Sequence, residues 1–285
     1  MRPAPAAEDL GRHVELAGAR AAASPLVRRL ARFGFFCKAF VYTILSALAL
    51  MAAAGLGGRA TDSRGAITTI AREPYGRALV GVLAIGMAAL GAWFVIAALA
   101  DRGGRGRGWT HLVVRFAKAA GGLMYVGLAW WAATLALGGA PGPSSNAITR
   151  SLTARALDLP GGRLAVAIAG AVLLVIAFHQ ARNGWRTFRH PEKQLALHRV
   201  GASLRAWAPR LSLVGYAAQA LVFALMGAFL LQAAVERDPH EATGFDGALA
   251  TVAKQPYGMA LLGVVALGLL TYALTAAVEA RCKRL

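Results

Sequence analysis

The stretch GAITTIAREPYGRALVGVLAIG, residues 65–86, decides the fold, because it returns as GALATVAKQPYGMALLGVVALG at residues 247–268. The two copies are identical at 13 of 22 positions, and most other positions exchange similar residues. The residues that precede each copy also align, with Gly34, Ala39, Val41 and Tyr42 corresponding to Gly215, Ala220, Val222 and Phe223. The chain therefore contains an internal repeat, which governs how every other feature is interpreted.

Each copy combines long apolar runs that carry no charge. Four such runs have 20 to 25 residues and occupy residues 78–100, 119–140, 211–235 and 259–278. Two less regular runs cover residues 33–56, which include Lys38, and residues 164–181. An α-helix needs about 20 apolar residues to cross the hydrocarbon core of a bilayer. The sequence therefore predicts six membrane-spanning helices.

A third, more divergent copy lies between the other two. Pro160-Gly161-Gly162-Arg163 aligns with Pro74-Tyr75-Gly76-Arg77 but lacks the tyrosine. In the span that precedes this segment, Phe116 and Tyr125 align with Phe33 and Tyr42 of the first copy. Because every copy holds two spans, all three copies point the same way, which implies a pseudo-rotation axis along the membrane normal. The predicted fold class is an all-α membrane protein with six transmembrane helices in three parallel two-helix repeats.

Short amphipathic helices are predicted in the outer loops that join the two spans of a repeat. Apolar residues recur there at helical spacing, as Ala66, Ile67, Ile70 and Ala71 and again as Ala248, Leu249, Val252 and Ala253. Candidate N-caps are Asp62 or Ser63, Ser145 or Asn146, and Asp246. The proline of Pro-Tyr-Gly then ends the short helix, and its glycine is expected to free the turn into the next span.

In these repeated residues, the chain resembles the bacterial membrane family called domain of unknown function 1206. The resemblance is carried by Gly-Ala followed by Pro-Tyr-Gly, and it covers about residues 28–280. It implies three two-helix repeats in the cytoplasmic membrane and no assigned activity. The middle repeat departs from the pattern at Pro160-Gly161-Gly162.

The predicted organisation follows from the spans. It consists of an N-terminal cytoplasmic tail (1–27), repeat 1 (28–103), repeat 2 (109–185), a basic cytoplasmic linker (186–208), and repeat 3 with a short tail (209–285). Nineteen Lys and Arg residues fall on the side of the two termini and nine on the other side. The positive-inside rule therefore places both termini in the cytoplasm.

The net charge of +18 reflects the scarcity of Asp and Glu and the placement of basic residues in the gaps between spans. Nucleic-acid binders instead cluster basic residues with aromatic ones on a soluble face, so this class is excluded. Membrane lipids with acidic headgroups on the cytoplasmic side are the expected partners. The candidate headgroup contacts are Arg105, Arg107, Arg186, Arg189 and Lys193.

Polar residues inside or at the ends of spans are the candidate ligand-binding residues, because such residues are costly in a membrane. They are Lys38, its repeat equivalent Gln219, Asp101 and Glu279. One interpretation is contact with an anion or substrate on the common axis. The interpretation preferred from the sequence is an ion pair between Lys38 and Asp101 or Glu279, or a lysine that extends to the headgroups.

The sequence leaves two functional classes. No nucleophile elbow, HExxH motif or intramembrane carboxylate cluster is present, so the sequence indicates no catalytic residue, metal or cofactor. A structural or interaction role in the cytoplasmic membrane is ranked first, because it requires little beyond the close packing that Ala- and Gly-rich spans provide. The alternative is a small-solute or ion transporter or channel, ranked second because few polar groups lie in the spans.

Overall fold

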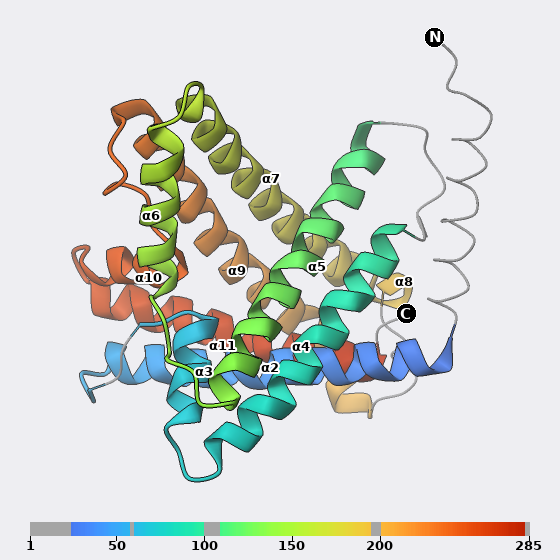
Figure 1. The fold of residues 1–285 in the computed structure, drawn as a ribbon. Coiled ribbons are helices and arrows are strands. Elements are labelled where there is room, and N and C mark those ends of the chain that lie inside the picture. The colour runs from blue at the N-terminus through green and yellow to red at the C-terminus, as the bar shows by residue number, and fades with distance from the viewer. Residues whose placement is uncertain (1–23, 58–59, 100–108, 195–200, 283–285) are drawn as a thin grey trace, which may run out of the picture. The chain divides into compact units, whose positions relative to one another are not determined.

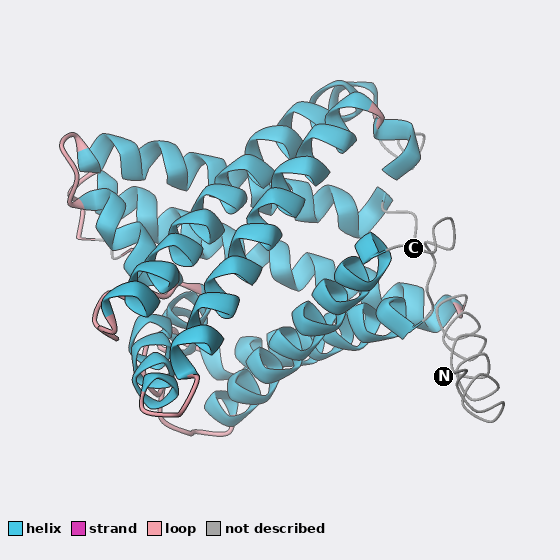
Figure 2. Cartoon of the chain, turned by 90° about the horizontal axis from the view of Figure 1, so that it is seen from above, coloured by secondary structure: helices cyan, strands magenta, loops and turns pink. Residues whose placement is uncertain are grey.

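A computed structural model of the chain describes residues 24–57, 60–99, 109–194 and 201–282, and its regular structure there is helical (Figures 1 and 2). Each repeat consists of a long helix, a short helix and a second long helix. They are α2 (Pro25–Ala53), α3 (Ser63–Ala71) and α4 (Gly76–Leu99); α5 (Trp109–Ala136), α6 (Ser145–Leu157) and α7 (Gly162–Arg189); and α9 (Ala202–Glu236), α10 (Phe245–Ala253) and α11 (Gly258–Cys282). A single-turn helix, α8 (Pro191–Gln194), follows α7.

The six long helices are long and apolar enough to cross a membrane, which confirms the predicted fold class and makes this a multi-pass membrane protein. Two of them extend into the range predicted as the linker 186–208. Helix α7 ends at Arg189, and α9 begins at Ala202. The 35 residues of α9 correspond to about 52 Å of helix, so its first turns extend beyond the hydrocarbon core.

The chain divides into two compact units. The first contains α2 up to Lys38, together with α4 and α5. The second contains the rest of α2 from Ala39, together with the three short outer helices and the long helices α7, α9 and α11. Repeat boundaries and unit boundaries therefore differ, since each unit combines helices from neighbouring repeats.

Within the first unit, glycines bring α2 and α4 into close contact. A methyl group on Gly34 would lie 2.7 Å from both the carbonyl oxygen of Gly86 and the Cβ of Leu90. A methyl group on Gly86 would collide with the side chain of Cys37. In a membrane, where apolar burial does not drive helices together, such small residues allow the backbones to approach and gain dispersion contacts.

The same crossing recurs in the second unit between α9 and α11. A methyl group on Gly215, the equivalent of Gly34, would lie 2.6 Å from Cα of Tyr272. A methyl group on Gly268, the equivalent of Gly86, would lie 2.5 Å from Cβ of Ala218. Ala218 corresponds in turn to Cys37, so repeats 1 and 3 share one packing arrangement as well as a sequence pattern.

Consecutive repeats are joined by a second kind of crossing. Helices α4 and α5 meet where Gly91 faces Gly122, and α7 and α9 meet where Gly170 faces Gly227. In the alignment, Gly170 corresponds to Ala84 rather than to Gly91, so the two junctions touch at different depths. At the α7–α9 junction, the Arg163 guanidinium also donates to the Ala234 carbonyl at 2.9 Å, which caps the end of α9.

The Pro-Tyr-Gly turn differs from the prediction that its glycine provides the unusual backbone conformation. Tyr75 and Tyr257 have φ of 61° and 58°, and Gly161 occupies this left-handed position in the middle repeat with φ 78°. The following glycine is needed for a different reason. A methyl group on Gly258 would collide with the Ala253 carbonyl oxygen, so this position requires close backbone approach. Both tyrosines are exposed, which suits aromatic side chains at a membrane interface.

The N-caps confirm one prediction and correct two. Asp62 caps α3 by accepting from the Gly65 backbone N–H at 2.9 Å. Ser144, rather than Ser145 or Asn146, caps α6. The N-cap of α10 is Gly244, and Asp246 lies in its first turn instead. Gly244 is required there because a side chain would strike the backbone of the α6 start, only 2.6 Å away at the Ser145 carbonyl carbon.

Candidate functional site

One face of α9 carries three buried polar side chains. Ser212, Tyr216 and Gln219 recur at spacings of four and three residues, which places them on the same side of a helix. They are 1%, 8% and 2% exposed, although each lies in or next to an apolar span. Their burial shows that they face other helices of the protein, so their hydrogen-bonding groups must find partners inside the fold.

Helix α11 supplies the facing residues. Tyr272 and Glu279 are seven residues apart, or two helical turns, and both are buried. The Tyr216 hydroxyl donates to Oε1 of Glu279 at 2.7 Å. Gly184 of α7 makes room for this tyrosine, since a methyl group there would lie 2.8 Å from Cβ of Tyr216. A carboxyl group is thereby held by a hydroxyl near the end of a membrane-spanning helix.

The second part of α2 completes the arrangement. The Gln219 side-chain amide donates to the Tyr42 hydroxyl at 3.1 Å. The Tyr272 ring packs edge-on against Tyr42, with centroids 4.9 Å apart, and against Tyr216, with centroids 5.4 Å apart. We call Tyr42, Tyr216, Gln219, Tyr272 and Glu279 the buried polar network. All five belong to the second unit.

Two polar atoms beside or within this network have no hydrogen-bond partner in the described part of the chain. They are Oε1 of Gln219 and Oγ of Ser212. Leaving a buried polar group unpaired costs about 1–3 kcal/mol, so such atoms call for an explanation. Because a carboxamide oxygen accepts hydrogen bonds and a hydroxyl both donates and accepts, each of these atoms has capacity for a water or another polar group.

Of the four predicted ligand-binding residues, the structure connects two. Gln219 and Glu279 both belong to the network: Gln219 donates to Tyr42, Glu279 accepts from Tyr216, and the Tyr272 ring packs against both tyrosines. Lys38 belongs to the first unit, is 7% exposed, and its ammonium lies 5.8 Å from the Tyr125 ring centroid. It is therefore not on the lipid-facing surface. Asp101 lies outside the described residues, and pairing of Lys38 with either acid stays a prediction.

Sequence reasoning missed Ser212, Tyr216 and Tyr272. Hydroxyl and aromatic residues are common in membrane helices, so individually they gave no signal. Their spacing relative to Gln219 and Glu279 was the available clue, since it places each set on one helical face.

The predicted headgroup contacts are described in part. Arg186 and Arg189 are exposed on the last turn of α7, and the Arg189 guanidinium lies 5.0 Å from the Trp185 ring centroid. An exposed tryptophan beside arginines is typical of a membrane–water interface. Arg105 and Arg107 lie outside the described residues, as does the side chain of Lys193.

A second polar cluster surrounds the start of α10. The Gly244 backbone N–H donates to Oδ1 of Asn146 at 3.0 Å, joining α10 to α6. Oδ1 of Asp246 and the hydroxyl of Thr243 are buried without a partner in the described part of the chain. Burial raises the pKa of Asp62, and the Asp246 carboxylate raises it further, while the hydrogen bond from Gly65 opposes the shift. Two carboxyl groups therefore repel each other between the outer helices.

This repulsion predicts the pH dependence of stability. A pKa raised by folding favours the protonated native state, so the stabilisation is complete below the ordinary pKa of about 4 and is lost as pH rises through the raised value. Asp62→Asn keeps the N-cap and removes the charge. We expect Asp62→Asn to raise the melting temperature at pH 7 and to have no effect below about pH 4.

Thermal unfolding of the detergent-solubilised protein between about pH 3 and pH 8 tests this expectation. Glu73→Gln, which removes an exposed carboxylate near the other end of α3, serves as the control and should leave the profile unchanged. A melting temperature for Asp62→Asn that is lower than that of the unchanged protein at pH 7 would contradict the expectation.

Comparisons with known proteins agree with the repeat structure. The family model described as Domain of Unknown Function (DUF1206) matches three segments, residues 33–101, 116–187 and 214–283. The chain is 34% identical over 255 residues to the uncharacterized protein YxxB of Bacillus subtilis (strain 168), covering 88% of this chain and 90% of that protein. No solved structure matches the chain.

Proposed function

Because the chain belongs to the family described as Domain of Unknown Function (DUF1206), a description that assigns no activity, we propose a function from the buried polar network. The protein binds a small polar solute or ion at the buried polar network and serves in its transport across the bacterial cytoplasmic membrane. Both termini lie in the cytoplasm, as the distribution of Lys and Arg supports.

The observation that carries the proposal is a cluster of five buried polar side chains from three membrane helices, in which the carboxamide oxygen of Gln219 has no partner within the described residues. Ionisable residues in membrane helices are rare and mark substrate, ion or proton pathways. Few polar groups lie in the spans, which by itself disfavours transport. The structure supports transport because these few groups lie together, and because Gln219 Oε1 has capacity to bind a donor.

Recognition at this site would use hydrogen bonds and aromatic surfaces. Gln219 would accept from a hydroxyl, amine or water of the solute, and Ser212, two helical turns away on α9, would bind a separate water or polar group. The rings of Tyr42, Tyr216 and Tyr272 offer edges and faces that suit a compact cation or a small polar molecule. This set provides binding groups and no nucleophile–base pair, so we propose no enzymatic activity.

A structural or interaction role is the second candidate. It is favoured by the tight crossings at Gly34 and Gly215, which are suited to a rigid, densely packed bundle. In that case, the network would hold α2, α9 and α11 together and bind no solute. On the cytoplasmic side, Arg186 and Arg189 would contact acidic lipid headgroups in either case.

Native mass spectrometry of protein released in mild detergent tests the proposal. We expect a discrete small molecule on the unchanged protein and a loss of at least about tenfold in its affinity in two variants. Gln219→Leu removes the carboxamide oxygen that would accept from the molecule, and Glu279→Gln keeps the acceptor for Tyr216 but removes the negative charge. Thr275→Val is the matched control, because the Thr275 hydroxyl is buried on α11 but donates only to its own helix, at the Thr271 carbonyl.

Either of two results would favour the structural role instead. One is heterogeneous phospholipid as the sole bound material. The other is a small molecule whose occupancy is equal in Gln219→Leu and Thr275→Val. Melting temperatures measured on the same samples separate a lost ligand contact from an unfolded variant.

A further inference from the structure

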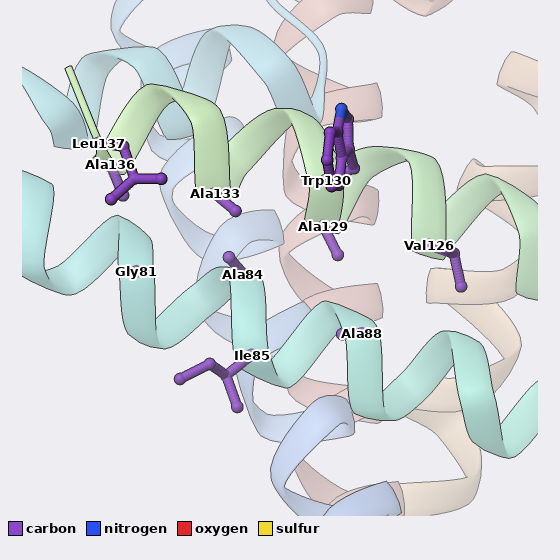
Figure 3. A pocket seen from close by; sticks show the side chains of 10 residues that line it. All are labelled: Gly81, Ala84, Ile85, Ala88, Val126, Ala129, Trp130, Ala133, Ala136 and Leu137. Atoms are coloured by element: carbon purple, nitrogen blue, oxygen red, sulfur yellow. The ribbon is translucent and has the colours of Figure 1, made fainter. Parts of the chain in front are cut away.

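A groove runs between α4 and α5 on the exposed surface of the first unit (Figure 3). Small side chains form its floor, with Ala84 on one helix and Ala129 and Ala133 on the other. Ile85 and Trp130 line it as larger residues that are 63% and 75% exposed. All the lining residues are apolar or glycine, and the groove holds about 450 Å³.

The groove exists because α4 and α5 touch at a different depth along their axes than α7 and α9 do. Helices α7 and α9 touch at Gly170 and Gly227, which correspond to Ala84 and Ala129. Helices α4 and α5 instead touch two turns further along α4, at Gly91. They therefore leave a gap at the level where the other junction is closed.

The dimensions of the groove indicate which molecule it fits. From Arg77 to Ala88, α4 rises about 16 Å, which is about half of the 30 Å hydrocarbon thickness, or one leaflet. The groove is thus about as long as one leaflet is thick and is lined by apolar residues and glycine, which suits the acyl chain of a lipid.

A positive charge lies at the outer end of the groove. Arg77 is exposed one turn before Gly81, and its Nη1 lies near the end of α5, 3.8 Å from where a methyl group on Gly138 would be. Its equivalent, Arg163, is used to cap α9. Within the described residues, no hydrogen bond or ion pair occupies the Arg77 guanidinium, so it is available to a phosphate.

We propose that this groove binds one phospholipid of the leaflet on the side of the short helices, with an acyl chain between α4 and α5 and its phosphate at Arg77. Arginine suits phosphate because its planar N–H groups form paired, charge-assisted hydrogen bonds. The site is separate from the buried polar network and does not depend on the function proposed for it.

Titration of delipidated full-length protein with dioleoylphosphatidylglycerol, with bound lipids counted by native mass spectrometry, tests this proposal. We expect one lipid to bind before the others. Ala133→Leu fills the groove with the residue found at its equivalent, Leu231, and Arg77→Gln removes the charge. Each should weaken the first binding event by about tenfold.

The controls change similar residues outside the groove. Ala92→Leu enlarges an exposed residue of α4, and Arg72→Gln removes an exposed arginine near the start of that helix; both should bind the first lipid normally. Ala88→Leu fills the groove from its other wall, should Ala133→Leu unfold. Equal lipid affinity in all variants would overturn the proposal. So would a lipid-free dimer that Ala133→Leu dissociates, since the groove would then bind a second copy.

Discussion

Replacing Gly215 with alanine is expected to destabilise the protein by about 1–3 kcal/mol, and replacing it with leucine to prevent folding. The added methyl group would lie 2.6 Å from both Cα and N of Tyr272. Backbone atoms cannot rotate away as a side chain can, so α9 and α11 would have to separate. Because this crossing also places Tyr216 against Glu279, the network should be lost together with the packing.

Gly127→Ala on α5 is the matched control, because no atom lies within 4 Å of the added methyl group. It should leave stability unchanged or raise it slightly, since alanine favours the helix more than glycine does. Thermal unfolding in the same detergent provides the measurement. Equal melting temperatures for Gly215→Ala and Gly127→Ala would contradict the close crossing of α9 and α11.

The six spans and the three repeats could be predicted because both depend on local sequence. A charge-free run of 20 or more residues has few alternatives to a membrane helix, and the repeat is visible in the letters themselves. The short helices were predictable from apolar spacing. Their N-caps were less so, because Gly244 caps α10 for a tertiary reason, the proximity of Asn146 and its neighbour Ser145.

The Pro-Tyr-Gly turn shows where residue preferences mislead. Glycine is the usual residue at positive φ, yet the positive φ belongs to Tyr75 and Tyr257. The middle repeat carried the clue, since Gly161 replaces the tyrosine at this position. The alignment recorded that difference as a departure from the pattern, whereas the structure shows the same backbone conformation with a residue that adopts it more readily.

The candidate site was predicted in part. Gln219 and Glu279 were recognisable because amide and carboxyl groups are costly in a membrane. That a tyrosine on α9 reaches Glu279 on α11, and that Gln219 reaches Tyr42 on α2, depends on helix rotation and crossing depth. These follow from the tertiary fit of glycines such as Gly184 and Gly215, which no local pattern specifies. The same holds for the groove between α4 and α5.

The central claim is that water and a polar solute reach Gln219 inside the membrane. Gln219→Cys, made in a chain with Cys37 and Cys282 replaced by alanine, places a thiol at this position. Repeat 3 already has alanine, Ala218, at the equivalent of Cys37, so the first replacement suits the packing. Val222→Cys is the control, since Val222 lies one turn further on α9 and is 0% exposed.

The most direct test is the rate at which a charged, membrane-impermeant methanethiosulfonate modifies these two thiols in sealed vesicles, read by mass. Thiol reactivity requires access and formation of the thiolate, both favoured by polar surroundings. We expect Gln219→Cys to react at least about tenfold faster than Val222→Cys, because the network opens to water during transport. Equally slow reaction at both positions would show a dry network and would contradict the proposed function.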